Sequence, residues 1–313
     1  AYACGSVPAL RTLVQAVSFN PSLKAALEHD YLQNVVASQT KGGITVSVDA
    51  IVADEKQINL FYRIESKDYR EFVCSASFSD QDGNDFSGFF MSSGGLAASG
   101  EECTATLEFP GTETIPSQFR FTVQIEQVSA DTSETHWDVP DSSEAAFTFP
   151  LTVNASEIAR GERYEIGQWI TLDGQQVLID HVEIYPTHIR IATQGAEDNT
   201  AWLKTLICNF TDEQGNTTDR VRNGLSASGS DEDRSVPLTL HQENSFFWDS
   251  KHLTLQIYGA RWSDKSKRTT TFDLSTGQPI GLLPPSVYSA QAFWSGSSLK
   301  IEAAAKPVDG GTV

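Results

Sequence analysis

The most regular pattern of apolar and polar positions in this chain runs from residue 43 to residue 66. Apolar and polar side chains alternate over residues 44–48, and a second apolar run occupies residues 58–64 after a polar break at residues 54–56. Alternation with a period of two is typical of a β-strand with one buried face. We therefore predict two strands joined by a short polar turn.

Upstream of this hairpin, apolar residues recur at the helical period. Asn20 and Pro21 combine a capping residue with a first-turn proline, which is a typical helix start. Two apolar stripes follow the helical period, one made of Leu10, Leu13, Val14 and Val17 and the other of Leu23, Leu27, Tyr31 and Val35. We predict a helical lead over residues 1–42 that packs on the first sheet and ends at Gly42 and Gly43.

The chain after residue 66 consists mainly of short strand-like runs, and its second half repeats the first. The sequence FSDQDGN at residues 78–84 returns as FTDEQGN at residues 210–216, an offset of 132 residues. The strand pattern at residues 58–62 returns at residues 189–193. A repeated spacing of this kind indicates two copies of one structural unit in tandem.

We therefore predict a mainly β protein with two tandem Ig-like β-sandwich domains, because evenly spaced short strands are typical of sandwiches. The first domain spans residues 43–155 and the second spans residues 156–278. A C-terminal extension covers residues 279–313 and contains a late strand from Ser298 to Ala303.

The repeated acidic segment, from Asp80 to Asn84 in the first domain, has two interpretations. An Asp-Gly pair between apolar runs is a strong signal for a hairpin turn, because turn residues need positive φ angles. The alternative is a calcium-binding loop, but the segment lacks both the Glu at the twelfth position and the helices of an EF-hand. The turn is the favoured interpretation.

The net charge and the first residues of the chain indicate which partners and which upstream segment to expect. The chain has 313 residues and a formal net charge of −19, so we expect neither nucleic acid nor an anionic lipid surface as a direct partner. No run of about 18 apolar residues occurs. The chain opens AYACGSVPAL without a Met, and we expect a membrane span or signal peptide upstream of it.

The four cysteines are Cys4, Cys74, Cys103 and Cys208, without a CxxC pair or a zinc-like spacing. Cys74 and Cys103 lie on separate strand-like runs of one domain and form a candidate disulfide, with buried free thiols as the alternative. Cys4 loosely matches a lipoprotein cleavage site, so it is a candidate lipid anchor.

Motifs of catalysis are missing from the sequence: it contains no nucleophile elbow, no HExxH, no P-loop and no GxGxxG. We predict that the protein is not an enzyme and needs no cofactor. His181, Glu183 and His188 are the nearest approach to a metal site, but Pro186 interrupts the strand between them. Ordinary surface placement is favoured, so we predict no metal site.

Aromatic residues suggest a binding function. All six Trp residues lie after residue 136, and Phe246, Phe247 and Trp248 are consecutive among polar residues. If these three side chains are exposed on a loop, they form a candidate ligand site that stacks on sugar rings. The alternative is that they cap the core of the second sandwich.

One resemblance covers most of the chain. The segments FNPSLKAALEHDYLQ and GITVSVDAIVADEKQINLFYRIES, followed by the acidic Gly-Asn turn, resemble the domain of unknown function that follows the single membrane span in anti-sigma-factor-like proteins of Gram-positive bacteria. Residues 156–278 resemble a second β domain of unknown function that often follows it. The resemblance implies the extracytoplasmic part of a single-pass protein of the cell membrane.

From this resemblance we expect a sensor or protein-interaction ectodomain of a membrane-anchored sigma-factor regulator. The expected partner is an extracellular ligand or protein, while a sigma factor would be reached only through a cytoplasmic segment outside this chain. The lead from Pro8 to Val36 is where we expect coupling to the membrane. The alternative function is a cell-surface or cell-wall carbohydrate-binding module, anchored by lipid at Cys4.

Overall fold

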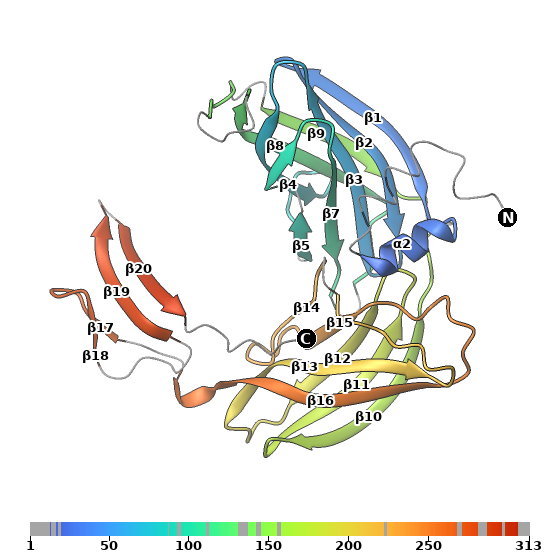
Figure 1. Ribbon diagram of the computed structural model, residues 1–313, viewed down its shortest axis with the longest axis vertical. Coiled ribbons are helices and arrows are strands. Elements are labelled where there is room, and N and C mark those ends of the chain that lie inside the picture. The colour runs from blue at the N-terminus through green and yellow to red at the C-terminus, as the bar shows by residue number, and fades with distance from the viewer. Residues whose placement is uncertain are drawn as a thin grey trace.

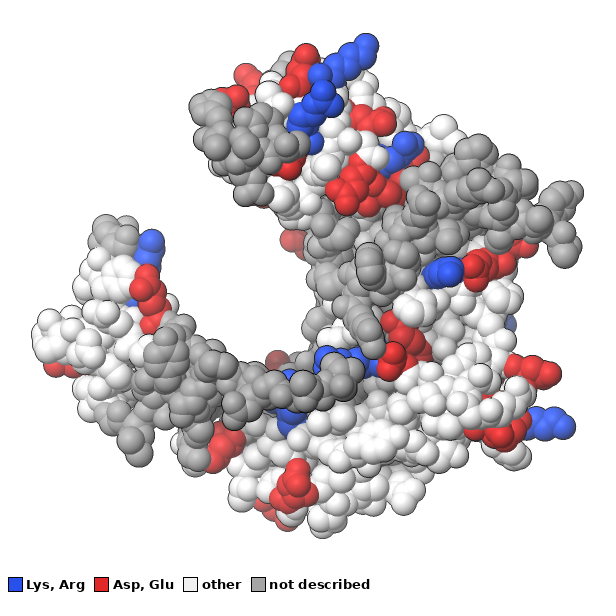
Figure 2. Space-filling model, viewed as in Figure 1, with Lys and Arg blue, Asp and Glu red and all other residues white. Residues whose placement is uncertain are grey.

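The protein consists of two β-sandwiches, one above the other in Figure 1, and an arm of two hairpins that projects from the second sandwich. The computed structural model describes residues 13, 17, 20–86, 88–92, 95–110, 113–130, 137–141, 145–154, 158–221, 224–267, 271–280, 287–295 and 298–305. On the face drawn in Figure 2, acidic side chains are spread over both sandwiches, in keeping with the charge of the sequence.

The first sandwich packs a five-stranded sheet against a four-stranded sheet, and all strand pairs are antiparallel. The order in the first sheet is β1 (Gln33–Lys41), β2 (Ile44–Ala53), β3 (Gln57–Ser66), β7 (Glu102–Glu108) and β5 (Phe89–Ser92). The order in the second sheet is β6 (Leu96–Ala98), β4 (Glu71–Ser79), β8 (Gln118–Ser129) and β9 (Ala146–Thr152). The predicted hairpin over residues 43–66 is therefore confirmed as β2 and β3.

The second sandwich repeats this strand order. Its large sheet contains β10 (Glu162–Leu172), β11 (Gln175–Ile184), β12 (Ile189–Gly195), β15 (Leu238–Gln242) and β14 (Ala227–Ser228), in that order. Its small sheet pairs β13 (Ala201–Asp212) with β16 (Leu253–Asp264). The predicted mainly β fold with tandem sandwiches is confirmed, and β10 to β12 stand where β1 to β3 stand in the first sandwich.

The two acidic turns have matching hydrogen bonds. Asp80 Oδ1 accepts hydrogen bonds from the backbone N–H groups of Asp82 and Asn84, and Asp212 Oδ1 accepts them from Gln214 and Asn216. The following glycines adopt φ angles of 92° and 86°. Because backbone donors satisfy these carboxylates, both segments are turns, as the sequence favoured.

The helical lead is shorter than the sequence pattern predicts. Helix α2 (Pro21–Glu28) is capped by the Asn20 side chain, which accepts a hydrogen bond from Leu23 N at 2.9 Å. The predicted helix through Val35 is wrong, because the chain turns at Asp30, with a φ of 65°, and continues as β1. Of the first predicted helix only Leu13 and Val17 are among the described residues, and both are buried.

After β16, a short 3₁₀ helix η2 (Lys265–Lys267) leads into the arm. The arm pairs β17 (Thr271–Asp273) with β18 (Gln278–Ile280) and β19 (Val287–Ser295) with β20 (Ser298–Ala305). The predicted late strand at Ser298–Ala303 lies within β20. Among the helices that the structure describes, none has the length and apolar character needed to cross a membrane.

Candidate functional site

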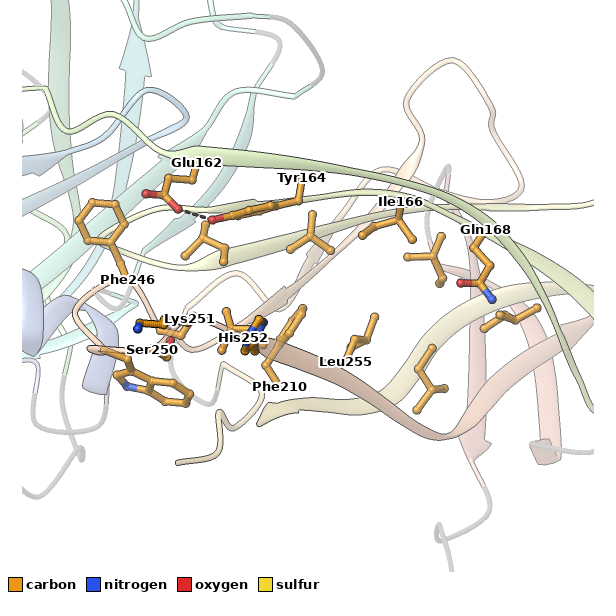
Figure 3. A pocket seen from close by; sticks show the side chains of 18 residues that line it. Glu162, Tyr164, Ile166, Gln168, Phe210, Phe246, Ser250, Lys251, His252 and Leu255 are labelled. Atoms are coloured by element: carbon orange, nitrogen blue, oxygen red, sulfur yellow. Dashed lines mark hydrogen bonds between the residues drawn. The ribbon is translucent and has the colours of Figure 1, made fainter. Parts of the chain in front are cut away.

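The second sandwich contains a groove between the edge strands β10 and β16, with a volume of about 710 Å³. Figure 3 shows Tyr164, Ile166 and Gln168 of β10 facing Leu255 of β16 across this space. Its inner wall is apolar and contains Ile170, Ile179, Val182, Leu253 and Ile257. We call it the β10–β16 groove.

In the first sandwich, β9 closes the corresponding gap between the edges of the two sheets. We call this gap the seam of a sandwich. Phe147, Phe149 and Leu151 of β9 are buried in the core, while the strand pairs with β8 along its length. On the other side, Gln39 and Lys41 of β1 donate hydrogen bonds to backbone carbonyls of β9. Thus β9 bridges the two sheets at this seam.

No such strand closes the second sandwich among the residues that the structure describes. Within the described strands, β16 pairs with β13 alone and β10 pairs with β11 alone. After β16 the described elements of the chain form η2 and the arm, as Figure 1 shows. The groove is therefore the place that a strand like β9 occupies in the first sandwich.

One end of the groove is polar and aromatic. Phe246 and Trp248 line it together with the charged side chain of Lys251. The Tyr164 hydroxyl donates a hydrogen bond to Glu162, and this bond raises the pKa of the tyrosine. This end can therefore offer both ring faces and hydrogen-bonding groups to a ligand.

The three consecutive aromatic residues that the sequence singled out are separated by the structure. Phe246 and Trp248 line the groove and are half-buried. Phe247 instead stacks on His29, with ring centroids 4.0 Å apart. A turn closed by Trp248 N and Ser245 O, 3.0 Å apart, sends neighbouring side chains in different directions.

Helix α2 contacts both sandwiches. Its apolar face, with Leu23, Ala26 and Leu27, is buried against Val52 and Phe61 on the outside of the first large sheet. At its first turn, Ser22 donates hydrogen bonds through its N–H and hydroxyl groups to Glu243 of the second sandwich. Helix α2 therefore connects the two domains, and we call it the clamp helix.

A buried polar junction joins the sandwiches beside this helix. The turn at residues 54–56, which the pattern predicted as polar, places Asp54 in the interior with no exposed surface. Asp54 Oδ1 accepts hydrogen bonds from the N–H groups of Lys56 and Gln57, and Oδ2 accepts one from Thr187 of the second sandwich. Sequence pattern alone did not find this role, since a polar turn residue ordinarily faces solvent.

Of the candidate metal residues of the sequence, His181 lies 4.0 Å from Glu183, whereas His188 has other neighbours. His188 is buried in this junction, where its Nδ1 lies 3.6 Å from Asp54 Oδ2. His181 lies 2.8 Å from the carboxylate of its neighbour Asp180. The structure brings Glu108 and His241 to His188 instead, and neither was singled out in the sequence.

The candidate disulfide is not formed in the structure, where Cys74 and Cys103 are both buried thiols, the alternative that the sequence left open. The two residues belong to facing sheets, on β4 and β7, and both lie in the core. Burial raises the pKa of each thiol to about 12, so both stay protonated at neutral pH. The candidate lipid anchor Cys4 lies outside the described residues.

Two domain models match parts of the chain. A domain of unknown function, DUF4179, matches residues 1–66, and a family of unknown function, DUF5643, matches residues 161–287. No curated protein matches the chain. A solved structure of "the conserved domain protein from Bacillus anthracis" is similar, with 11% identity, a TM-score of 0.49, and coverage of 88% of this chain and 86% of that one.

Proposed function

We propose that this chain is an extracytoplasmic sensor and protein-interaction module, and that its β10–β16 groove binds an extended segment of a partner protein. The observation that carries this proposal is the open seam of the second sandwich at the place where β9 closes the first. An exposed strand edge beside apolar pockets is the arrangement used in recognition by β-strand addition.

The first sandwich indicates the chemistry of the occupant. β9 places Phe147, Phe149 and Leu151 into the core at alternate positions, while Thr148 and Thr152 face outward and remain exposed. In the groove, Leu253, Leu255 and Ile257 of β16 offer the matching apolar wall. The expected ligand is therefore a strand with apolar residues at every second position.

We further propose that the module belongs to a membrane-anchored regulator of sigma-factor activity. What supports this is the match at residues 1–66, because that domain is commonly associated with anti-sigma factor-like proteins. The clamp helix follows the N-terminal segment in the sequence and contacts both sandwiches. A ligand that favours one arrangement of the sandwiches would then shift the position of the helix.

A peptide with the β9 sequence AAFTFPLTVN, residues 145–154, is the most direct probe. Titration followed by Trp fluorescence and calorimetry should show saturable binding to the wild-type chain. The Ile257→Asp variant should lose binding, because a carboxylate would be placed in the apolar wall. Val36→Asp is the matched control, since Val36 is fully exposed on β1 and lies outside the groove.

Two outcomes would contradict strand addition. One is the absence of binding at millimolar peptide, and the other is equal binding of a peptide in which both phenylalanines are replaced by Asp. A fluorescence change that survives Ile257→Asp but is lost in Val36→Asp would place the binding site elsewhere and also reject the groove.

Coupling through the clamp helix has its own test. Leu27 is buried against Val52 and Phe61, so Leu27→Asp should detach the helix from the first sheet. Limited proteolysis should then cut near residues 28–32, while the folded sandwiches keep their far-ultraviolet circular dichroism. Unchanged resistance to protease would reject the helix as the coupling element.

A second candidate function is carbohydrate binding, and the half-buried Phe246 and Trp248 at the groove end favour it. Soluble oligosaccharides from peptidoglycan are the probe, with Trp248→Ala as the variant. Binding of the sugar and no binding of the β9 peptide would replace the first proposal by this one. Peptide mapping of the native protein would also distinguish an upstream membrane span from a lipid on Cys4.

A further inference from the structure

Three potential metal ligands meet at the junction between the sandwiches. Glu108 comes from the end of β7 in the first sandwich, while His188 and His241 come from the second, just before β12 and within β15. One ligand atom from each side chain lies within 4.8 Å of the other two. All three residues are at most 3% exposed.

The hydrogen bonds of the two histidines orient their free nitrogens. His241 Nδ1 lies 2.7 Å from the Leu225 carbonyl oxygen, which can only accept, so this nitrogen carries a proton. Thr187 Oγ1 donates a hydrogen bond to Asp54, so the same hydroxyl oxygen accepts a hydrogen bond from His188 Nδ1 at 2.8 Å. An imidazole in this tautomer has its lone pair on Nε2.

The atoms that remain have no hydrogen-bond partner. This applies to the Nε2 atoms of His188 and His241 and to Glu108 Oε2. His241 Nε2 and Glu108 Oε2 lie 3.1 Å apart, and neither atom has a hydrogen-bond partner among the described residues. An unsatisfied buried polar atom costs about 1–3 kcal/mol, so a partner shared by these three atoms would offset that cost.

The cations at the junction contact oxygen atoms other than Glu108 Oε2 among the described residues. Glu183 Oε1 lies 3.4 Å from the guanidinium of Arg163. The Arg190 guanidinium lies 3.5 Å from Oε1 of Glu108, the other oxygen of the carboxylate, and 3.3 Å from Glu183 Oε2. Lys56 turns away and donates to the Glu113 carbonyl at 2.7 Å.

We propose that Glu108 Oε2, His188 Nε2 and His241 Nε2 bind one divalent transition-metal ion of the zinc class, and that this ion joins the two sandwiches. Two imidazoles and one carboxylate are a donor set suited to Zn²⁺. The Asp54–Thr187 pair and the Leu225 carbonyl hold the imidazoles in the orientation that metal-binding histidines need.

The test uses the whole chain after removal of metal with EDTA. Calorimetric titration with ZnCl2 should show one bound equivalent and a higher melting temperature. CoCl2 should give the visible absorption of cobalt with nitrogen and oxygen ligands. His241→Gln should lose both signals, and His181→Gln is the matched control because His181 also lies beside carboxylates, Asp180 and Glu183.

Substitution of a buried histidine can unfold the junction, so the cobalt spectrum of the wild-type chain is the decisive measurement. Thr187→Val gives a milder variant, which should weaken Zn²⁺ binding by about 10-fold or more through loss of His188 orientation. The proposal is overturned if no cobalt absorption bands appear, or if the His181→Gln variant no longer binds the metal ion. The proposal is also overturned if an NMR spectrum shows that both imidazoles are protonated and that Zn²⁺ does not change this spectrum. Peptide binding in the groove is measured separately, so failure of either proposal is recognisable.

Discussion

The first sandwich and the second share one strand order but differ in how their seams end. In the first, β9 covers the gap between β1 and β8, and large aromatic side chains such as Phe121 and Phe149 fill a closed core. In the second, the strand after β16 leaves for the arm and the seam remains a groove. The difference shows that a repeated fold can acquire a candidate binding site when one strand is directed elsewhere.

The largest effect should come from a cavity in the closed core. Phe149→Ala in the first sandwich should lower the free energy of unfolding by about 3–5 kcal/mol, because the removed ring is fully enclosed. Leu255→Ala in the groove wall should cost much less, since Leu255 is only half-buried. Urea unfolding followed by circular dichroism measures both, and equal losses would contradict the difference between the seams.

The next largest effect should be a difference in hydrogen-exchange protection between β8 and β16. β8 pairs with a strand on each side, β4 and β9, whereas β16 pairs with β13 alone. Amide hydrogens on the outer edge of β16 should therefore exchange faster than those of β8 in hydrogen-exchange mass spectrometry. The β9 peptide should slow the exchange in β16 selectively. Equal protection of the two strands in the free protein would indicate that the groove is already filled.

A buried carboxyl makes the first sandwich sensitive to pH. Burial, together with the charge of Asp49, raises the pKa of Glu102 to about 8, even though Arg63 opposes this rise. A raised folded pKa stabilises the fold fully below the ordinary glutamate pKa and loses that contribution as the pH rises through about 8. Glu102→Gln should thus raise the melting temperature at pH 9 relative to wild type.

The same substitution serves as its own control at lower pH. At about pH 4, where the Glu102 carboxyl is protonated in both the folded and the unfolded state, Gln and Glu should give similar melting temperatures. A stabilisation that is the same at both pH values would show that ionisation of Glu102 is not its cause.

The smallest effect concerns the two turns, which the repeat makes equivalent. Hydrogen bonds from Asn84 lower the pKa of Asp80. Burial opposes the corresponding shift of Asp212, but bonds from Asn216 prevail and lower its pKa as well. Asp80→Ala and Asp212→Ala should each lower the melting temperature slightly at neutral pH, and by similar amounts.

The pH dependence of these two variants has a definite sign. A depressed folded pKa contributes stability above the ordinary aspartate pKa, and that stability is lost as the pH falls through the folded value. The difference from wild type should therefore shrink in acid. Thermal melts at several pH values measure it, and markedly unequal effects of the two variants would break the equivalence of the turns.

Sequence pattern alone determined the fold class, the hairpin over residues 43–66 and the tandem repeat. These features are local, because alternating side chains and Asp-Gly turns specify strands and reversals within a few residues. The pattern failed between residues 31 and 42, where Tyr31 and Val35 continue a helical stripe by chance but the chain forms β1. Pairing with β2 outweighed that local signal.

Tertiary structure decided what the candidate sites contain. Only folding brings Glu108 from one domain to His188 and His241 of the other, since sequence periodicity does not predict contacts between two domains. Likewise the aromatic run could be read from the sequence, but the turn at Ser245–Trp248 determined that Phe246 and Trp248 face the groove and Phe247 packs on His29. The sequence specifies the chemical type of each side chain, whereas the direction and neighbours of each side chain depend on long-range packing.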